Sequence, residues 1–168
     1  MLFVQQVAGY TALRSGLALL PITVVMFFLS PRVGRLSMRL GPRLFMGAGP
    51  LIASAALAAM VRLEPGFDYW SELLPPLLVF SVGLSMIVAP LTATVLADAG
   101  ESDSGIASGV NNAVARVAGL LGIAVVGALV AGSENQLDLS GFRLSMLVTA
   151  LLVGAGGIVG LGGIRNPR

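Results

Sequence analysis

The chain of 168 residues contains no cysteine and no histidine, and only 11% of its residues are charged. The missing thiols and imidazoles exclude cysteine nucleophiles, histidine acid–base catalysis and zinc sites of the usual kind. A soluble domain usually carries about 25% charged residues. With 56% apolar residues, a soluble globule of this length lacks the charged side chains to cover its surface. The composition therefore predicts a membrane protein, because lipid accepts an apolar exterior.

Lysine is also missing, so all ten basic residues are arginines. Six of them lie in residues 30–43 or at the C-terminus, and no basic surface with interleaved aromatic residues is available. This distribution argues against nucleic-acid binding, despite the net charge of +2. An intramembrane enzyme is disfavoured as well, because the apolar runs contain neither an acid nor metal ligands beside a nucleophile. The sequence indicates no catalytic residue, metal site or cofactor.

Five apolar runs approach the length of about 20 residues that a membrane-spanning helix needs. The predicted fold class is therefore an all-α polytopic membrane protein, with one domain over residues 1–168. Pro21 and Pro90 lie inside two of the runs and predict helix kinks, because proline removes a backbone hydrogen bond. The predicted spans are residues 15–29, 44–61, 73–97, 105–131 and 142–161.

The stretch between the first two runs, residues 30–43, carries four arginines and no acid. Short loops rich in basic residues stay in the cytoplasm, and their side chains also bind anionic lipid headgroups. If this loop is inside, alternation places the N-terminus outside, residues 62–72 and 132–141 outside, and the C-terminus inside. The prediction is a multi-pass protein of the cell membrane with a cytoplasmic C-terminus.

Arg116 is the one charged residue within a predicted span, near its centre, where insertion costs about 2.5–3.5 kcal/mol. Ser108, Asn112 and Arg116 follow an i, i+4, i+8 spacing, which places them on one helical face beside Asn111. One hypothesis is that this polar stripe faces a substrate or coupling pathway. The alternative is structural, with Arg116 bonded to a carbonyl or extended to the interface and Asn112 in a helix–helix hydrogen bond.

The runs are rich in glycine, most of all residues 154–163, which read GAGGIVGLGG. In water this composition would weaken a helix. Between membrane helices, glycine allows close backbone approach, which drives packing where lipid removes the hydrophobic incentive. The pattern predicts a tightly packed polytopic bundle.

Residues 34–43, GRLSMRLGPR, resemble the motif G-x-x-x-D-R-x-G-R-R that transporters of the major facilitator superfamily carry between two spans of each half. Gly34, Arg39, Gly41 and Arg43 match the motif, whereas Met38 and Pro42 replace its aspartate and one basic residue. Residues 3–21 resemble the passage into the tenth span of the fourteen-span drug/proton antiporter branch, and residues 104–127 resemble its thirteenth span. Asn112 and Arg116 fall on typical Asn and Arg positions of that thirteenth span.

The resemblance implies a C-terminal portion of a proton-coupled efflux carrier for small molecules, which works by alternating access between two halves. The N-terminal half would be absent, and the short apolar start at residues 1–4 also suggests a fragment. Asn111, Asn112 and Arg116 would line or gate the central cavity, with Ser108 on the same stripe. Arg35 and the motif residues would hold the cytoplasmic gate. The expected partners are a small-molecule substrate, protons, membrane lipid and the missing half, which supplies most proton-coupling acids.

A second hypothesis belongs to a different class. A small membrane scaffold, or one subunit of a split transporter, would use the same glycine-rich helices to bind partner helices.

Overall fold

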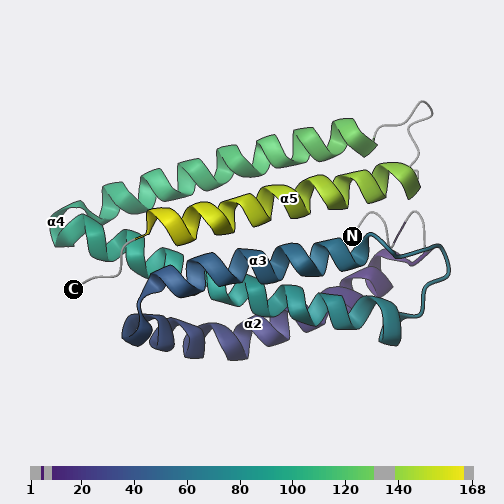
Figure 1. Cartoon of the computed structure of the whole chain (residues 1–168), viewed down its shortest axis with the longest axis horizontal. Coiled ribbons are helices and arrows are strands. Elements are labelled where there is room, and N and C mark those ends of the chain that lie inside the picture. Colours follow the sequence, from purple (N-terminus) through teal and green to yellow (C-terminus); the bar gives the residue numbers. More distant parts are fainter. Residues whose placement is uncertain (1–4, 6–8, 131–138, 165–168) are drawn as a thin grey trace.

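The computed structural model of the chain describes residues 5, 9–130 and 139–164, apart from the side chains of residues 93, 95–102, 129 and 130. This part of the chain is helical and contains no strand (Figure 1). The predicted tail at residues 1–4, most of the predicted loop 132–141 and the C-terminal arginines lie outside the described residues. The elements are α2 (Ala12–Leu40), α3 (Pro42–Met60), η1 (Tyr69–Leu73), α4 (Leu74–Val130) and α5 (Leu139–Gly163).

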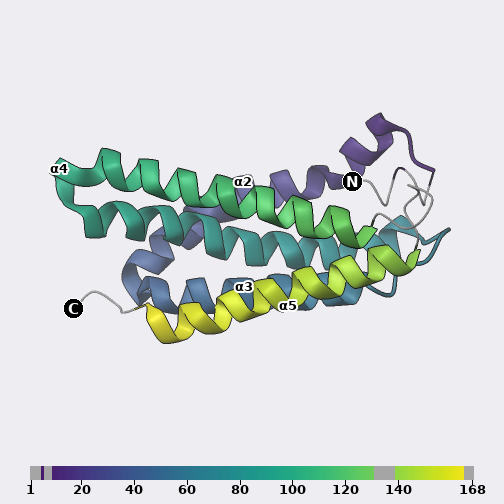
Figure 2. The same ribbon diagram turned by 90° about the horizontal axis from the view of Figure 1, so that it is seen from above.

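Five helical segments in the described chain are long and apolar enough to cross a membrane. The prediction of an all-α polytopic protein with five membrane helices is therefore confirmed. Two of these segments belong to α4, which doubles back on itself between them (Figures 1 and 2). A straight helix of its 57 residues would measure about 85 Å, far beyond a hydrocarbon core of about 30 Å. The segments are Ala12–Leu40, Pro42–Met60, Tyr69–Thr92, Asp103–Ala128 and Leu139–Gly163.

The stretch 30–43, predicted as a loop, is mostly helical instead. Helix α2 continues through Pro31 to Leu40, and a single residue separates it from α3. That residue, Gly41, has φ 89° and ψ 145°, a conformation that glycine adopts without a Cβ penalty. The helix persists because Val33 and Ser37 are buried against the bundle, and tertiary packing overrides the local signal of a proline.

Helix α3 is packed between α4 and α5 (Figures 1 and 2). Its backbone touches that of the first segment of α4 where two glycines meet. A Cβ atom at Gly83 would lie 2.7 Å from the carbonyl oxygen of Gly49 and 2.7 Å from the amide nitrogen of Ala53. Such distances leave no room for a side chain, so the absence of one sets how closely the two helices approach.

The glycine-rich run of α5 forms the second close contact of α3. A Cβ atom at Gly157 would lie 2.9 Å from the carbonyl oxygen of Gly47, and one at Gly160 would lie 2.7 Å from that of Met46. Across the same contact, the Ser54 hydroxyl donates a hydrogen bond of 2.7 Å to the carbonyl oxygen of Ala150. The prediction that the glycines of residues 154–163 serve close helix packing is confirmed at this contact.

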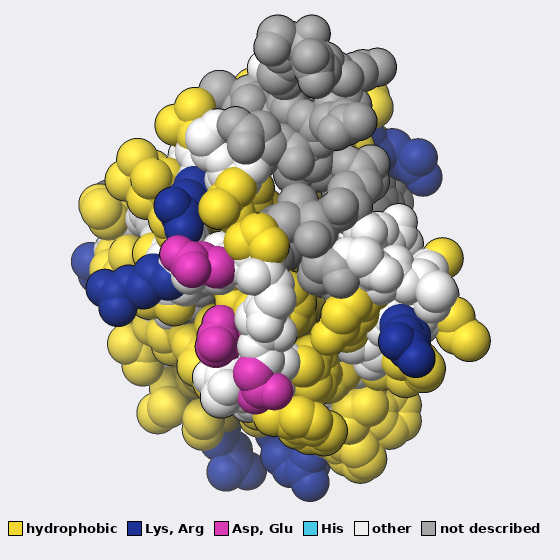
Figure 3. Space-filling model, turned by 90° about the vertical axis from the view of Figure 1, so that its right-hand side faces the viewer, with side chains coloured by type: hydrophobic (Ala, Val, Ile, Leu, Met, Phe, Trp, Pro, Cys, Tyr) yellow, Lys and Arg dark blue, Asp and Glu magenta, His cyan; other side chains and the backbone are white. Residues whose placement is uncertain are grey.

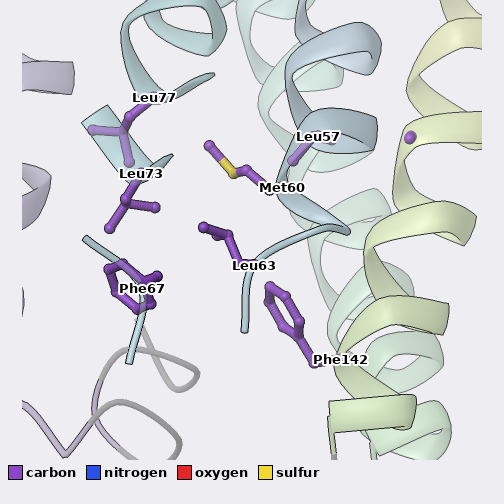
Figure 4. Packing of buried hydrophobic residues seen from close by; sticks show 8 residues of the cluster. Leu57, Met60, Leu63, Phe67, Leu73, Leu77 and Phe142 are labelled. Atoms are coloured by element: carbon purple, nitrogen blue, oxygen red, sulfur yellow. The ribbon is translucent and has the colours of Figure 1, made fainter. Parts of the chain in front are cut away.

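A hydrophobic cluster closes the end of the bundle where α3 passes into η1 (Figure 4). The connecting loop folds inward here, so that Leu63 and Phe67 are 4% and 9% exposed. Burying each such side chain stabilises the fold by about 1.5–3 kcal/mol. The loop is therefore part of the core. The buried members of the cluster are Leu57, Met60, Leu63, Phe67, Leu73, Leu77, Phe142 and Ala150.

The second segment of α4, Asp103–Ala128, contrasts with the rest of the bundle. None of its described side chains is buried. At each of its glycines, a Cβ atom would meet no atom within 4 Å. Tight packing is thus achieved around α3 but not around this segment. Its glycines are Gly105, Gly109, Gly119, Gly122 and Gly127.

Adjacent glycines of α5 test the close contact directly. We expect Gly157→Leu to lower the Tm of the detergent-solubilised protein by several degrees, because the new side chain meets Gly47, Leu51 and Pro50. Overpacking of this kind costs about 1–3 kcal/mol. Gly156→Leu is the matched control, since a Cβ atom there meets nothing within 4 Å. Equal Tm values for the two variants, measured by thermal unfolding, would contradict the assigned contact.

Candidate functional site

The four polar residues singled out from the sequence lie together on the second segment of α4. Ser108, Asn112 and Arg116 are exposed, and Asn111 is half-buried. Their spacing on a regular helix gives one continuous polar stripe. The side chains of Ser108, Asn112 and Arg116 are therefore available to a ligand or to another helix.

Arg116 occupies the middle of its segment. It lies thirteen residues after Asp103 and twelve before Ala128, which corresponds to about 20 Å and 18 Å along the helix axis. Its neighbours Val114, Val117 and Leu120 are 63%, 56% and 68% exposed. Arg116 is therefore an exposed charge among exposed apolar side chains near the middle of a helix segment of membrane-spanning length.

The stripe offers hydrogen-bond donors and acceptors but no means of covalent catalysis. A guanidinium group has five N–H donors in a fixed fork, which matches carboxylate or phosphate oxygens. The two asparagine side chains add amide donors and acceptors, and Ser108 adds a hydroxyl group. Among the described residues, no group of three or more His, Cys, Asp or Glu could hold a metal ion. The arrangement suits recognition of a polar or anionic group.

The motif residues predicted to form a gate lie at the end of the bundle where α2 passes into α3. Gly34 is half-buried, and a Cβ atom there would lie 3.5 Å from the Cβ of Ala89 on α4. Arg35 is exposed and donates from Nε to the carbonyl oxygen of Pro31, at 3.4 Å in its own helix. Arg39 is exposed in the last turn of α2. These residues are thus helical, and Gly41 alone forms the turn.

Arg43 joins this turn to the far end of the chain. Its Nε donates a hydrogen bond of 2.6 Å to the carbonyl oxygen of Leu161 in α5. The last four carbonyls of a helix lack partners within the helix, and basic groups there interact favourably with the helix dipole. The last arginine of the motif therefore ties α3 to the C-terminal end of α5, a contact that the sequence pattern did not predict.

The two prolines predicted to kink helices both lie inside helices. Pro21 is half-buried in α2, and Pro90 is completely buried in the first segment of α4. Upstream of Pro90, the hydroxyl groups of Ser81 and Ser85 donate to the carbonyl oxygens four residues earlier, at 2.6 and 2.8 Å. Hydrogen bonds of this kind often bend helices. The bend at Pro90 stays a prediction, which these two serine hydrogen bonds support.

The opposite end of the bundle carries acids as well as arginines (Figure 3). Glu64 and Arg143 form an exposed ion pair of 3.3 Å that joins the inward-folded loop to the start of α5. Asp68 caps η1 and accepts hydrogen bonds from the hydroxyl group and the amide of Ser71, which lower its pKa below the usual value. This cap is present at neutral pH and is lost as the pH falls through the lowered pKa.

Sequence reasoning missed an open cavity of about 660 Å³ at this same end. Tyr69 donates its hydroxyl proton to the carbonyl oxygen of Ala18 at 3.0 Å, which fixes the ring against α2. Tyr69 and Trp70 are neighbours in the sequence, and only the fold brings Arg14 beside them. The lining residues are Tyr10, Arg14, Leu17, Ala18, Tyr69 and Trp70.

Comparison with known proteins identifies the family of the chain. The family model described as Major Facilitator Superfamily matches residues 1–123, which include both the gate motif and the polar stripe. The predicted resemblance is thereby confirmed. Together with the five membrane-length helices, this match identifies a multi-pass membrane protein.

Several curated relatives are named for drug export or resistance. The uncharacterized MFS-type transporter EfpA of Mycobacterium tuberculosis is 32% identical over 130 residues, which are 77% of this chain and 24% of that protein. The cephamycin export protein CmcT of Amycolatopsis lactamdurans is 32% identical over 126 residues, 74% and 26% of the two chains. The methylenomycin A resistance protein of Streptomyces coelicolor is 30% identical over 167 residues, 99% and 34%. The chain thus spans about a quarter to a third of the length of these relatives.

The bond between Arg43 and α5 can be tested by removing the guanidinium group. We expect Arg43→Gln to lower the Tm by a few degrees, because a charge-assisted hydrogen bond at an exposed site contributes at most about 1 kcal/mol. Arg39→Gln is the control, since it removes the same charge from the same end, where Arg39 is exposed. An effect of Arg39→Gln as large as that of Arg43→Gln in thermal unfolding would count against the contact.

Proposed function

The chain belongs to the Major Facilitator Superfamily, and from this membership we propose that it is the C-terminal transmembrane portion of a carrier that exports small molecules. The match to residues 1–123 and the names of relatives that export or resist antibiotics support this proposal. The chain covers only 26% and 34% of these two relatives, so the remaining spans belong to the rest of the carrier.

The observation that carries the proposal is the unburied second segment of α4. A helix with a central arginine and a polar stripe is poorly suited to face lipid on every side. In carriers of this superfamily, substrate sites lie near the bilayer midplane between the two halves. We therefore assign the stripe of Ser108, Asn111, Asn112 and Arg116 to the central pathway, where it contacts or gates the substrate.

Alternating access requires that this part of the carrier rock as a unit. The glycine contacts of α3 with α4 and α5 favour such a unit, because closely packed helices move together more readily than they deform. The turn at Gly41 and the bond from Arg43 to Leu161 lie at one end of this unit. We propose that this end, with Gly34, Arg35 and Arg39, forms the cytoplasmic gate.

Proton coupling would require groups that titrate within the membrane. The predicted spans contain no aspartate, glutamate or histidine, so in a proton-coupled carrier the titrating carboxylates belong to spans outside these residues. Arg116 would influence them through its fixed positive charge, because a nearby cation favours the ionised form of a carboxyl group.

The proposed orientation places the gate in the cytoplasm of the cell. Four arginines with described side chains lie at that end, whereas three arginines at the other end are balanced by Glu64, Asp68 and Glu72. Basic residues near the ends of spans favour the cytoplasmic side. The loop between α3 and η1 would then face the exterior of the plasma membrane.

A split carrier is the second candidate, favoured by the same unburied segment. In that case a separately encoded protein would supply the helices that cover Asp103–Ala128. If the carrier is split, this chain should co-purify with a second, separately encoded polytopic protein. If it is not split, one long polypeptide should contain both this chain and the helices that cover Asp103–Ala128.

The role of the stripe is tested with Arg116→Gln in the complete carrier. We expect export of fluorescent amphiphilic drugs from loaded cells to fall about tenfold or more, because loss of a charge-assisted contact costs about 1.5–3 kcal/mol. Arg62→Gln, a matched neutral variant of an exposed arginine in the loop, should export normally. Normal export by Arg116→Gln at normal membrane abundance would leave Arg116 with a structural role only.

Single cysteines test the orientation, because the native chain has none. In intact cells, a membrane-impermeant maleimide should label Pro65→Cys in the loop between α3 and η1. It should label Met38→Cys, whose native side chain is 72% exposed, only after the membrane is permeabilised. The reverse labelling pattern would overturn the proposed topology.

A further inference from the structure

Among the side chains that the structure describes, none carries a negative charge near the middle of the helix segment that holds Arg116. The closest acid in the sequence is Asp103, thirteen residues away, or about 20 Å along the helix. The other described segments have no acid near their midpoints either. The eight acids of the chain are Glu64, Asp68, Glu72, Asp98, Glu101, Asp103, Glu134 and Asp138.

A charged side chain within a membrane helix is usually paired, extended to the interface or neutralised, and none of these applies to Arg116 within the described part of the chain. Arg116 makes no hydrogen bond or ion pair to any described residue, and its side chain is exposed. Extension to the interface would have to span about 18 Å, the distance to the nearer end of its segment, which is well beyond the reach of a side chain. Deprotonation does not relieve the charge either, because an arginine stays protonated in proteins.

The surroundings of Arg116 favour a protein partner over lipid. Asn112 lies one turn earlier on the same face, and no described residue covers either side chain. A Cβ atom at Gly109 or Gly119 would meet nothing within 4 Å, so another helix can approach this segment closely. Most of the carrier lies outside these residues, since the chain covers 24–34% of its relatives. A further transmembrane segment is therefore available to cover this face.

We propose that Arg116 forms an ion pair with an aspartate or glutamate on a transmembrane segment of the same carrier outside residues 1–168. This inference rests on the proposed function, because it assumes an export carrier whose spans extend beyond these residues. The partner is a carboxylate of the protein, because an export cycle leaves the substrate site empty at each return and a substrate cannot neutralise Arg116 in that state. Arg116 binds the carboxylate with its forked donors, and the Asn112 amide donates to a remaining lone pair of one carboxylate oxygen.

Charge exchange in the complete carrier tests the pair. We expect Arg116→Glu to lower both the Tm and drug export, the latter about tenfold or more, because it places two carboxylates together. Each intramembrane aspartate or glutamate outside residues 1–168 is then replaced by arginine in the Arg116→Glu background. One of these exchanges should restore the Tm and export, whereas the same replacement alone, with Arg116 present, should impair both.

Arg62→Glu is the matched control, because Arg62 is an exposed arginine of the loop and its reversal should change neither quantity. The proposal is overturned if Arg116→Glu behaves as the native carrier does, or if no exchange restores an impaired variant. It is also overturned if Arg116→Gln loses export of anionic drugs alone and keeps its Tm, since the substrate would then be the counter-ion. A native carrier that exports no drug would refute the proposed function, while the Tm would still report the pair.

Discussion

Close contact between helix backbones at glycines is the constraint on which this bundle depends. Lipid tails are as apolar as leucine, so helices gain little by hiding apolar side chains from them, and they associate through close packing instead. At Gly83 and Gly157, the backbone of a neighbouring helix occupies the space of the missing side chain. Both contacts fall on α3, which therefore positions α4 and α5 relative to each other.

The bundle is asymmetric as a result. On one side of the molecule, α3 is in contact with its neighbours along its length, and the loop after it adds Leu63 and Phe67 to the core. The second segment of α4 receives none of this packing and bears the polar stripe. The described chain is therefore a well-packed unit with one polar face that it does not cover itself.

The two ends of the bundle differ in how their charges are used. At the end with Gly41, Arg32 and Arg35 donate to carbonyl oxygens of their own helix, and Arg43 donates across to α5. At the other end, Arg143 pairs with Glu64, and Asp68 caps η1. The first arrangement leaves a strongly positive surface beside a turn, and the second leaves nearly balanced charges around a buried loop. Only the first surface would attract anionic lipid headgroups.

The sequence by itself determined the membrane class, the five helices and the polar stripe, because hydropathy and helical periodicity are local properties of the chain. It also indicated the superfamily through the motif around Gly34 and Gly41. Only the tertiary structure decided that residues 30–40 are helical, since burial of Val33 and Ser37 outweighs the effect of Pro31. It also decided which glycines pack closely. Gly156 and Gly157 are adjacent residues of the same type, but only Gly157 lies against the backbone of a neighbouring helix. The contact of Arg43 with Leu161 likewise joins residues 118 positions apart, a relation that no local pattern contains.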